Sequence, residues 1–154
     1  MIETKYVDNF KKFYEDRKEF INARYDEAKP LCNSDRALNL DIAAYQSLID
    51  SNAVTVLEVF EDQEFIGYCS ITISPALLSK GRVDAKIDHL ALDEQARNRG
   101  CATFVLEEIE NLLKEQGVDE LGIVLPSTEK HDGFAKAKGY KKTVTIHTKN
   151  LEAV

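Results

Sequence analysis

The feature that most constrains this chain is a strand-like segment that leads through a glycine-bearing loop into a helix. Residues 85–92 have an extended pattern, the sequence Arg97-Asn98-Arg99-Gly100-Cys101-Ala102 follows, and a helical pattern then runs to about Gln116. At such a junction the loop N–H groups and the positive end of the helix dipole converge at one place. Arg97 and Arg99 add positive charge beside it. The junction therefore predicts an anion site that suits a phosphate group.

The second half of the chain alternates between helical and extended patterns. The helix after Gly100 has one apolar face, and Gly117 lies where a left-handed C-terminal cap is expected. That predicted face consists of Cys101, Phe104, Val105, Ile109, Leu112 and Leu113. A short buried strand over 121–125 follows, then a helix over about 128–138 that ends at Gly139, and a last strand over 144–148.

The first half predicts two helices and then a hairpin. A helical period of apolar residues runs from residue 8 to about 28, and Asn39 or Asp41 is a candidate cap for a second helix. Two β-patterned runs, 54–60 and 65–74, are separated by a polar turn, and a further strand follows at about 83–92. This order of elements predicts a mixed α/β sheet rather than an all-parallel one.

Composition limits the classes of function. At 154 residues the chain is expected to form one domain over 1–154, and a formal net charge of −7 disfavours a nucleic-acid binder. Since no run of about 20 apolar residues and no signal core is present, we expect neither a membrane segment nor export. Cys32, Cys69 and Cys101 include no Cys-x-x-Cys pair, so neither a disulfide framework nor a metal site is predicted. A cytoplasmic location is the simplest expectation.

Two blocks of the sequence together resemble the signature of the GNAT superfamily of N-acetyltransferases. They are Ile87-Asp88-His89-Leu90-Ala91-Leu92-Asp93-Glu94 followed by Arg97-x-x-Gly100-x-Ala102, and Phe134-Ala135-Lys136-Ala137-Lys138-Gly139-Tyr140. The resemblance covers about residues 54–151. It implies an α/β fold of the α+β type, with a mixed, largely antiparallel central sheet and helices on both faces. The long helical start and the segment Leu38-Asn39-Leu40-Asp41 also resemble GNAT proteins encoded by tailed phages.

The resemblance implies where acetyl-CoA, the co-substrate of the family, is held. Its pantetheine arm would pair with Leu90, Ala91 and Leu92 as an added β-strand. Gly100 would let the backbone approach the pyrophosphate closely, because glycine has no Cβ. The residues implied for the pyrophosphate loop are Arg97, Asn98, Arg99, Gly100, Cys101 and Ala102. Phe134, in the second block, completes the expected cofactor-binding residues.

Acetyl transfer to an amine requires a base and a donor for the oxyanion. An alkyl ammonium has a pKa of about 10 and must lose a proton before it attacks. Asp88 is the first candidate base, because strand alternation places Lys86, Asp88, Leu90 and Leu92 on one face, where apolar neighbours raise the pKa of a carboxyl. The glutamate base of better-known family members corresponds to Lys86 and is absent here. Asp88 is otherwise expected to make a structural hydrogen bond. The strand over 90–92 can supply the oxyanion donor.

The usual acid of the family is also missing. Many members protonate the departing CoA thiolate with a tyrosine, and this chain has Ala135 at that position. Tyr140 is the nearby catalytic candidate, although an aromatic residue there normally serves for packing. Because a thiol has a pKa of about 8.5, its thiolate is a tolerable leaving group. The loss is therefore expected to slow turnover by about ten- to a thousandfold rather than abolish it.

Other residues have both a structural and a functional interpretation. Cys101 is interpreted as a small buried hydrophobe rather than a nucleophile, since it lies on the apolar face of its helix. Alternation places His89 toward the helix layer as a structural histidine. His131 beside Asp132 either caps the last helix or approaches the acceptor. The aromatic residues of the first helix, which form either core or acceptor pocket, are Phe10, Phe13, Tyr14 and Phe20.

Two functional hypotheses follow. The first is an N-acetyltransferase that moves an acetyl group from acetyl-CoA to an amine by direct attack in a ternary complex. The second is a weakly active or inactive GNAT-fold protein that binds acyl-CoA or a protein partner, and Ala135 favours it. The expected acceptor is an amine-bearing small molecule or a protein amine, with no nucleic acid, membrane or metal involved. A homodimer, frequent in the family, is the oligomer considered.

Overall fold

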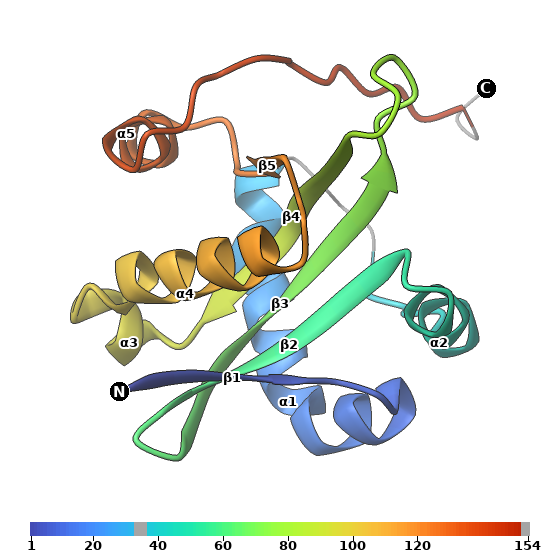
Figure 1. The fold of residues 1–154 in the computed structure, drawn as a ribbon. Helices are drawn as coiled ribbons and strands as arrows, with labels where there is room; N and C mark the ends of the chain where they lie inside the picture. The colour runs from blue at the N-terminus through green and yellow to red at the C-terminus, as the bar shows by residue number, and fades with distance from the viewer. Residues whose placement is uncertain (33–36, 152–154) are drawn as a thin grey trace.

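A computed structural model describes residues 1–32 and 37–151 and shows a five-stranded sheet with helices on both faces (Figure 1). The strands follow one another across the sheet in the order β1 (Ile2–Tyr6), β2 (Val54–Glu61), β3 (Glu64–Pro75), β4 (Val83–Leu92) and β5 (Glu120–Ile123). All neighbouring pairs are antiparallel except β4 and β5, which are parallel. The predicted mixed, largely antiparallel sheet is confirmed.

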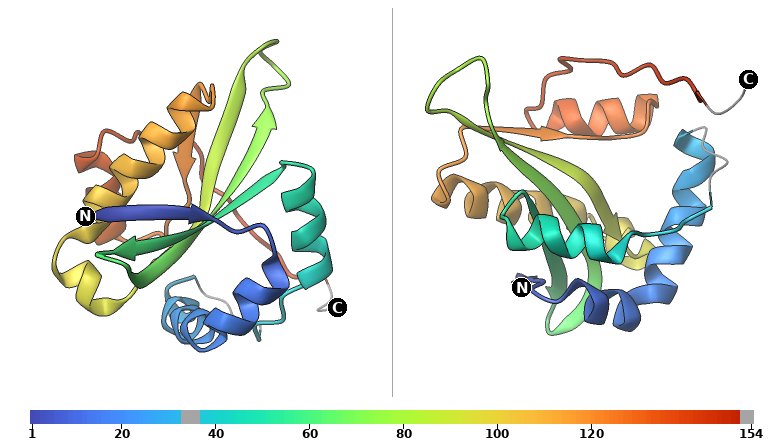
Figure 2. Two further views of the ribbon diagram at one scale, coloured as in Figure 1. Left: turned by 60° about the horizontal axis from the view of Figure 1, so that its bottom comes forward. Right: turned by 90° about the vertical axis from the view of Figure 1, so that its right-hand side faces the viewer.

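Helix α2 (Ile42–Asp50) begins directly after Asp41, one of the two capping residues predicted for it. Helices α1 (Phe10–Ala28) and α2 lie on one face of the sheet, and α4 (Cys101–Glu115) lies on the other (Figure 2). The Asp41 carboxylate accepts a hydrogen bond from the Ala44 N–H at 2.9 Å and so caps α2. The short helices are η1 (Lys29–Cys32), α3 (Glu94–Asn98) and α5 (Glu129–Ala137). No helix within residues 1–32 and 37–151 is both long and apolar enough to cross a membrane.

Two hydrophobic clusters hold these layers to the sheet. One fills the space between the sheet and α4, and its fully buried members include Leu57, Ile71, Ile87, Leu106 and Ile109. The other joins α1 and α2 to the opposite face, with Phe10, Phe13, Ile21 and Val56 buried in it. The aromatic residues Phe10 and Phe13 are thus core residues, as the helical pattern indicated.

The inward face of α4 differs slightly from the predicted one. Phe104 is 60% exposed, whereas Leu106, which was not in the predicted face, is buried. Residues two positions apart on a helix point about 200° apart, so both cannot belong to one narrow apolar face. The packing against the sheet selects Leu106.

Strand β1 was not predicted from the sequence. It pairs with β2 in the register Ile2↔Glu61 to Tyr6↔Leu57 and forms the edge of the sheet. Its five residues alternate weakly in polarity and are only partly buried. A short edge strand of this composition carries little local signal, because it depends on the partner strand for its hydrogen bonds.

The predicted last strand over 144–148 is wrong. Residues 141–150 have no regular secondary structure, and Val144 and Ile146 are each 75% exposed. Alternating β-branched residues favour an extended backbone, but a strand forms only where a neighbouring strand accepts and donates its hydrogen bonds. This segment does not pair with β5 or with any other strand of the described residues.

Candidate active site

The site lies where β4 and β5 separate. Their parallel pairing covers Asp84–Ile87 of β4, and the Val124 N–H donates to the Ile87 carbonyl oxygen at 2.9 Å as the last contact between them. Beyond this point a cavity of about 1110 Å³ is lined by β4 on one side and by residues 123–126 on the other. The cavity also reaches α1, the residues before α2, and the N-termini of α4 and α5.

A β-bulge at Asp88 reverses the side-chain alternation of β4. Ile71 of β3 faces Ile87, and the adjacent Ser70 faces His89, so Asp88 is an extra residue on β4. Before the bulge, Ile87 points into the α4-side cluster; after it, Leu90 and Leu92 do. The prediction that Asp88, Leu90 and Leu92 share a face is therefore wrong.

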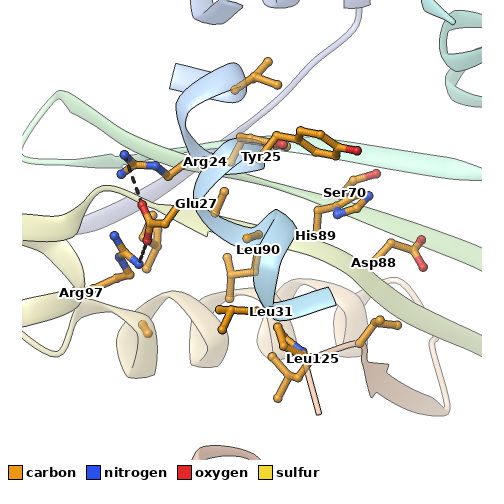
Figure 3. Close-up of a pocket in the computed structure, with 18 of the residues that line it drawn as sticks. Arg24, Tyr25, Glu27, Leu31, Ser70, Asp88, His89, Leu90, Arg97 and Leu125 are labelled. Atoms are coloured by element: carbon orange, nitrogen blue, oxygen red, sulfur yellow. Dashed lines mark hydrogen bonds and ion pairs between the residues drawn. The ribbon is translucent and has the colours of Figure 1, made fainter. Parts of the chain in front are cut away.

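His89 is also on the opposite face from the predicted one. It pairs with Ser70, whose strand neighbours Cys69 and Ile71 lie in the α4-side cluster, so Ser70 and His89 face α1 instead. Figure 3 shows Ser70, His89 and Asp88 close to one another on this face. All three line the cavity.

Backbone N–H groups of β4 point into the opening. The Asp93 N–H donates to the Ile66 carbonyl oxygen of β3 at 2.8 Å. Since successive N–H groups point to opposite edges of a strand, those of Leu92 and Leu90 point away from β3, toward the space where β5 has diverged. Two donors therefore face the cavity along an unpaired strand edge, an arrangement that suits an extended amide-bearing ligand.

The predicted loop before α4 contains the short helix α3. Asp93 caps α3 by accepting a hydrogen bond from the Ala96 N–H at 2.7 Å. Gly100 then has a φ of 74° and forms the N-cap of α4, a left-handed conformation that favours glycine. Because glycine has no side chain to cap the helix, the N–H groups of Cys101 and Ala102 are left for an external acceptor. Ala102 and Gly100 line the cavity, so this end of it is suited to an anion.

The two arginines beside this helix terminus are paired with carboxylates. Arg97 donates to Glu27 of α1, and Arg24 Nη2 lies 3.4 Å from the other oxygen of Glu27 (Figure 3). The hydrogen bond from Arg97 is the main reason that the pKa of Glu27 is lowered. Arg99 donates to Glu61 instead and does not line the cavity. The positive charge of Arg97 and Arg99 beside the helix terminus is thus held in ion pairs with Glu27 and Glu61.

The titratable groups nearest the diverging strands are Asp88 and His89. Asp88 accepts a hydrogen bond from the Thr72 hydroxyl, and its second oxygen lies 3.6 Å from Lys86 Nζ. His89 is exposed on the cavity wall. The surrounding protein nevertheless desolvates its imidazole and lowers its pKa below the usual 6.5, against the opposing effect of the Asp88 charge. A neutral imidazole at pH 7 can accept a proton.

Tyr140 lies outside the cavity. Its hydroxyl donates to Glu110 Oε2 at 3.0 Å, and burial together with this carboxylate raises its pKa further above the usual value. Phe134 does line the cavity. His131 lines it too, with Nδ1 2.6 Å from the hydroxyl of Thr128, the residue that caps α5.

Cys101 is buried at the start of α4, with its Sγ 3.2 Å from Glu61 Oε2. Desolvation and this carboxylate raise the pKa of the thiol, so it remains protonated and a poor nucleophile. Of the predicted cofactor-binding residues, all but Arg99 and Cys101 line the cavity; they are Leu90, Ala91, Leu92, Arg97, Asn98, Gly100, Ala102 and Phe134.

Sequence reasoning missed the contribution of α1 to the site. Glu27 and Arg24 lie about seventy residues before Arg97 along the chain, and only the packing of α1 against the sheet at Val56 and Tyr68 brings them together. Their spacing of three residues on one helix face was the single local signal available.

Comparison with known proteins fits this geometry. Residues 10–140 match the model of the acetyltransferase (GNAT) family. The chain belongs to the GNAT family. An uncharacterized N-acetyltransferase of Chlorobaculum tepidum is 33% identical over 79 residues, a stretch that spans 51% of this chain and 44% of that protein. Family membership supports acetyl transfer as the general activity.

Solved acetyltransferase structures share the fold over nearly the whole chain. One is an aminoglycoside acetyltransferase from an uncultured soil metagenomic sample in complex with sisomicin, with 15% identity, coverage of 97% and 96% of the two chains, and a TM-score of 0.70. Another is a predicted acetyltransferase from Clostridium acetobutylicum with acetyl-CoA, with 18% identity, coverage of 99% and 97%, and a TM-score of 0.67. At these identities the likeness concerns the fold.

Proposed function

We propose that this protein transfers the acetyl group of acetyl-CoA to a primary amine by direct attack in a ternary complex. The observation that carries the proposal is the continuity of one cavity. It runs from the uncapped N-terminus of α4 past the free edge of β4 to Asp88 and His89. Along this path the cavity offers first a phosphate site, then a strand edge for an amide-bearing arm, and last the proton-accepting groups. A thioester co-substrate needs these three features in this order.

The co-substrate fits the residues at both ends of this path. Its pyrophosphate would accept hydrogen bonds from the N–H groups at the start of α4, with Gly100 allowing close approach. Its pantetheine amides would pair with the free edge of β4 at Leu92, which leaves the Leu90 N–H for the thioester carbonyl oxygen. Arg97 would exchange its contact with Glu27 for the phosphate charge. The solved relatives that hold acetyl-CoA and sisomicin support an acetyl donor and an amine acceptor.

In the reaction, the neutral amine nitrogen attacks the thioester carbonyl carbon. His89 accepts the proton that the ammonium group gives up, and the Asp88 carboxylate stabilises the resulting imidazolium. The N–H of Leu90 donates to the oxyanion that forms on the carbonyl oxygen. When the tetrahedral intermediate collapses, the C–N bond stays, the C–S bond breaks, and CoA leaves as a thiolate. The second proton of the attacking nitrogen passes to water, which leaves the neutral amide.

The thiolate leaves without an acid from the usual position. Ala135 has no proton to donate, and the Tyr140 hydroxyl is engaged with Glu110. A thiolate of pKa about 8.5 is stable enough in water to depart unassisted, so turnover is expected to be slow rather than absent. A weakly active protein that mainly binds acyl-CoA is the second candidate function, and Ala135 is the observation that favours it.

The experiment measures CoA thiol release and acetyl-CoA affinity in parallel. We expect acetyl-CoA to bind, and an amine panel to release CoA at a rate that depends on the amine. Arg97→Glu should weaken acetyl-CoA binding at least tenfold, because it places a carboxylate beside the pyrophosphate. Lys114→Glu, an equal charge change on the exposed part of α4 outside the cavity, serves as the control.

The outcomes separate the two candidate functions. Acetyl-CoA binding without CoA release for any amine would support the binding protein and contradict the enzyme. Undiminished affinity in Arg97→Glu would contradict the assignment of the anion site itself.

A further inference from the structure

The part of the cavity that faces α1 and α2 is apolar and aromatic. Six side chains that line it define what we call the acceptor wall: Phe10, Phe13, Leu40, Tyr45, Val56 and Tyr68. They come from α1, the residues before α2, α2 itself, and the sheet face that also carries Ser70 and His89. The acceptor wall therefore begins directly beside the groups to which we assign proton transfer.

The acceptor wall is rigid. Phe10 stacks on Tyr45 with ring centroids 4.3 Å apart and an interplanar angle of 1°, and Phe13 meets Tyr68 edge-on at 5.6 Å. Phe10 and Phe13 are only 3% and 4% exposed, so they form the floor of the cavity and cannot turn away. A preformed aromatic surface of this kind favours an apolar or aromatic ligand, which loses water on binding without losing hydrogen bonds.

The charges around the cavity disfavour a ligand with many ammonium groups. Of the described residues that line it, three have carboxylates: Glu27, Asp88 and Glu94. Glu27 is paired with Arg97 and Arg24, and Glu94 lies on α3 beside the α4 terminus. On the sheet face, the carboxylate among the described lining residues is Asp88, one oxygen of which lies 3.6 Å from Lys86 Nζ.

Four cationic side chains among the described residues also line the cavity, namely Arg24, Lys29, Arg97 and Lys130. A second or third ammonium group of a bound ligand would therefore meet apolar walls or positive charge. Burying such a group without a partner is costly. A ligand with one ammonium group avoids this cost.

We propose that the acceptor is a primary amine with a single positive charge and an apolar, preferably aromatic, substituent. This inference rests on the proposed function. The ammonium group lies beside Asp88 and His89, and the substituent lies against the acceptor wall. Tyr45 and Tyr68 also present ring faces or edges that tolerate a nearby cation. This class differs from the polycationic aminoglycosides.

The experiment compares three acceptors in the CoA-release assay: 2-phenylethylamine, ethylamine and sisomicin. A single methylene group of a substrate that enters an apolar pocket changes kcat/KM by about ten- to two-hundredfold. The phenyl ring adds more apolar surface than one methylene. We expect kcat/KM for 2-phenylethylamine to exceed that for ethylamine and for sisomicin by about a hundredfold. Equal or higher kcat/KM for sisomicin or ethylamine would overturn the inference, whatever the variants do.

A matched pair of variants tests the acceptor wall itself. Leu40→Asp adds a carboxylate to a half-buried wall position, and Leu48→Asp adds one to the exposed face of α2. We expect Leu40→Asp to reduce the preference for 2-phenylethylamine over sisomicin at least tenfold and Leu48→Asp to leave it unchanged. An unchanged preference in a folded Leu40→Asp variant would overturn the assignment of this wall to the acceptor.

Calorimetric binding of the same amines distinguishes a wrong acceptor class from a wrong function. If no amine releases CoA, the proposed function fails. If 2-phenylethylamine nevertheless binds, and Leu40→Asp weakens this binding, the acceptor wall would still be assigned to an aromatic amine. Tighter binding of sisomicin, or no binding of 2-phenylethylamine, would overturn the inference.

Discussion

At the scale of single residues, the extra residue Asp88 decides which side chains meet in the cavity. Without the bulge, His89 would point into the α4-side cluster with Ile87, and its imidazole would need a buried partner. With it, His89 and Asp88 lie together on the cavity wall. One inserted residue thus turns a structural histidine into a candidate base (Figure 3).

The lowered pKa of His89 has a measurable consequence for activity. Because the pKa lies below 6.5, the imidazole stays neutral and able to accept a proton until the pH falls below that value. We expect the acidic limb of kcat/KM to lie below pH 6.5. His89→Gln should remove this limb and lower kcat/KM at pH 7 by about a hundredfold or more, the usual effect of losing a general base.

His131→Gln is the control for this pH profile, since His131 also lines the cavity but lies on α5. It should leave the acidic limb in place. A His89→Gln variant with the wild-type pH profile would contradict the assignment.

The same lowered pKa implies that the folded state loses stability below pH 6.5, because the unfolded chain then binds the proton more readily.

At the scale of secondary structure elements, helix α1 and the α3–α4 junction are joined through Glu27. This carboxylate binds Arg97 and Arg24 at once, so it ties the C-terminal end of α1 to the predicted phosphate loop. The Arg24 Nε atom is buried and has no hydrogen-bond partner within the described residues. The three residues therefore form a charged cluster in which a phosphate would compete with Glu27.

This competition predicts the effect of Glu27→Gln on cofactor affinity. Removing the carboxylate frees Arg97 for the pyrophosphate, so we expect acetyl-CoA to bind about 1.4- to fivefold more tightly, the range of a partly exposed ion pair. Titration calorimetry would measure the change. Glu19→Gln, a neutralisation on the exposed side of α1, is the matched control. Weaker binding in Glu27→Gln would instead assign Glu27 to holding Arg97 in position for the co-substrate.

At the scale of the whole molecule, the cavity lies between the two layers of helices and draws residues from both. The α4-side cluster supports the strand edge of Leu90 and Leu92, and the α1-side cluster supports the acceptor wall. A ligand in this cavity contacts α1, β4, α4 and α5 together. Its binding free energy should therefore add to the stability of the entire fold.

Thermal unfolding measures this coupling. At a concentration of one hundred times Kd, acetyl-CoA should stabilise the folded state by about 2.7 kcal/mol. For a chain of this size that corresponds to a rise in Tm of roughly 5–10 °C. At the same acetyl-CoA concentration, Arg97→Glu, which is expected to bind at least tenfold more weakly, should lose about half of the rise or more, while Lys114→Glu should keep it. A full rise in Arg97→Glu would show that the stabilising ligand binds elsewhere.

The regular elements were largely predictable because their signals are local. Asp41 caps α2, Gly117 and Gly139 adopt positive φ after α4 and α5, and the β2–β3 hairpin turns at the polar residues 61–64. Each of these depends on a few neighbouring residues. Strand β1 and the lack of a strand in the segment 141–150 were not predictable in this way, since strand pairing depends on a strand far along the chain.

The sequence by itself determined the family, the order of the main elements, and the residues that begin α4 at the edge of the cavity. Only the tertiary structure decided which face carries His89, because a bulge depends on the register with β3. It also decided that Arg97 and Arg99 meet Glu27 and Glu61. The attraction between two charges depends on their distance in space and not on their separation along the chain. The partners of these arginines therefore follow from the packing and cannot be predicted from neighbouring residues.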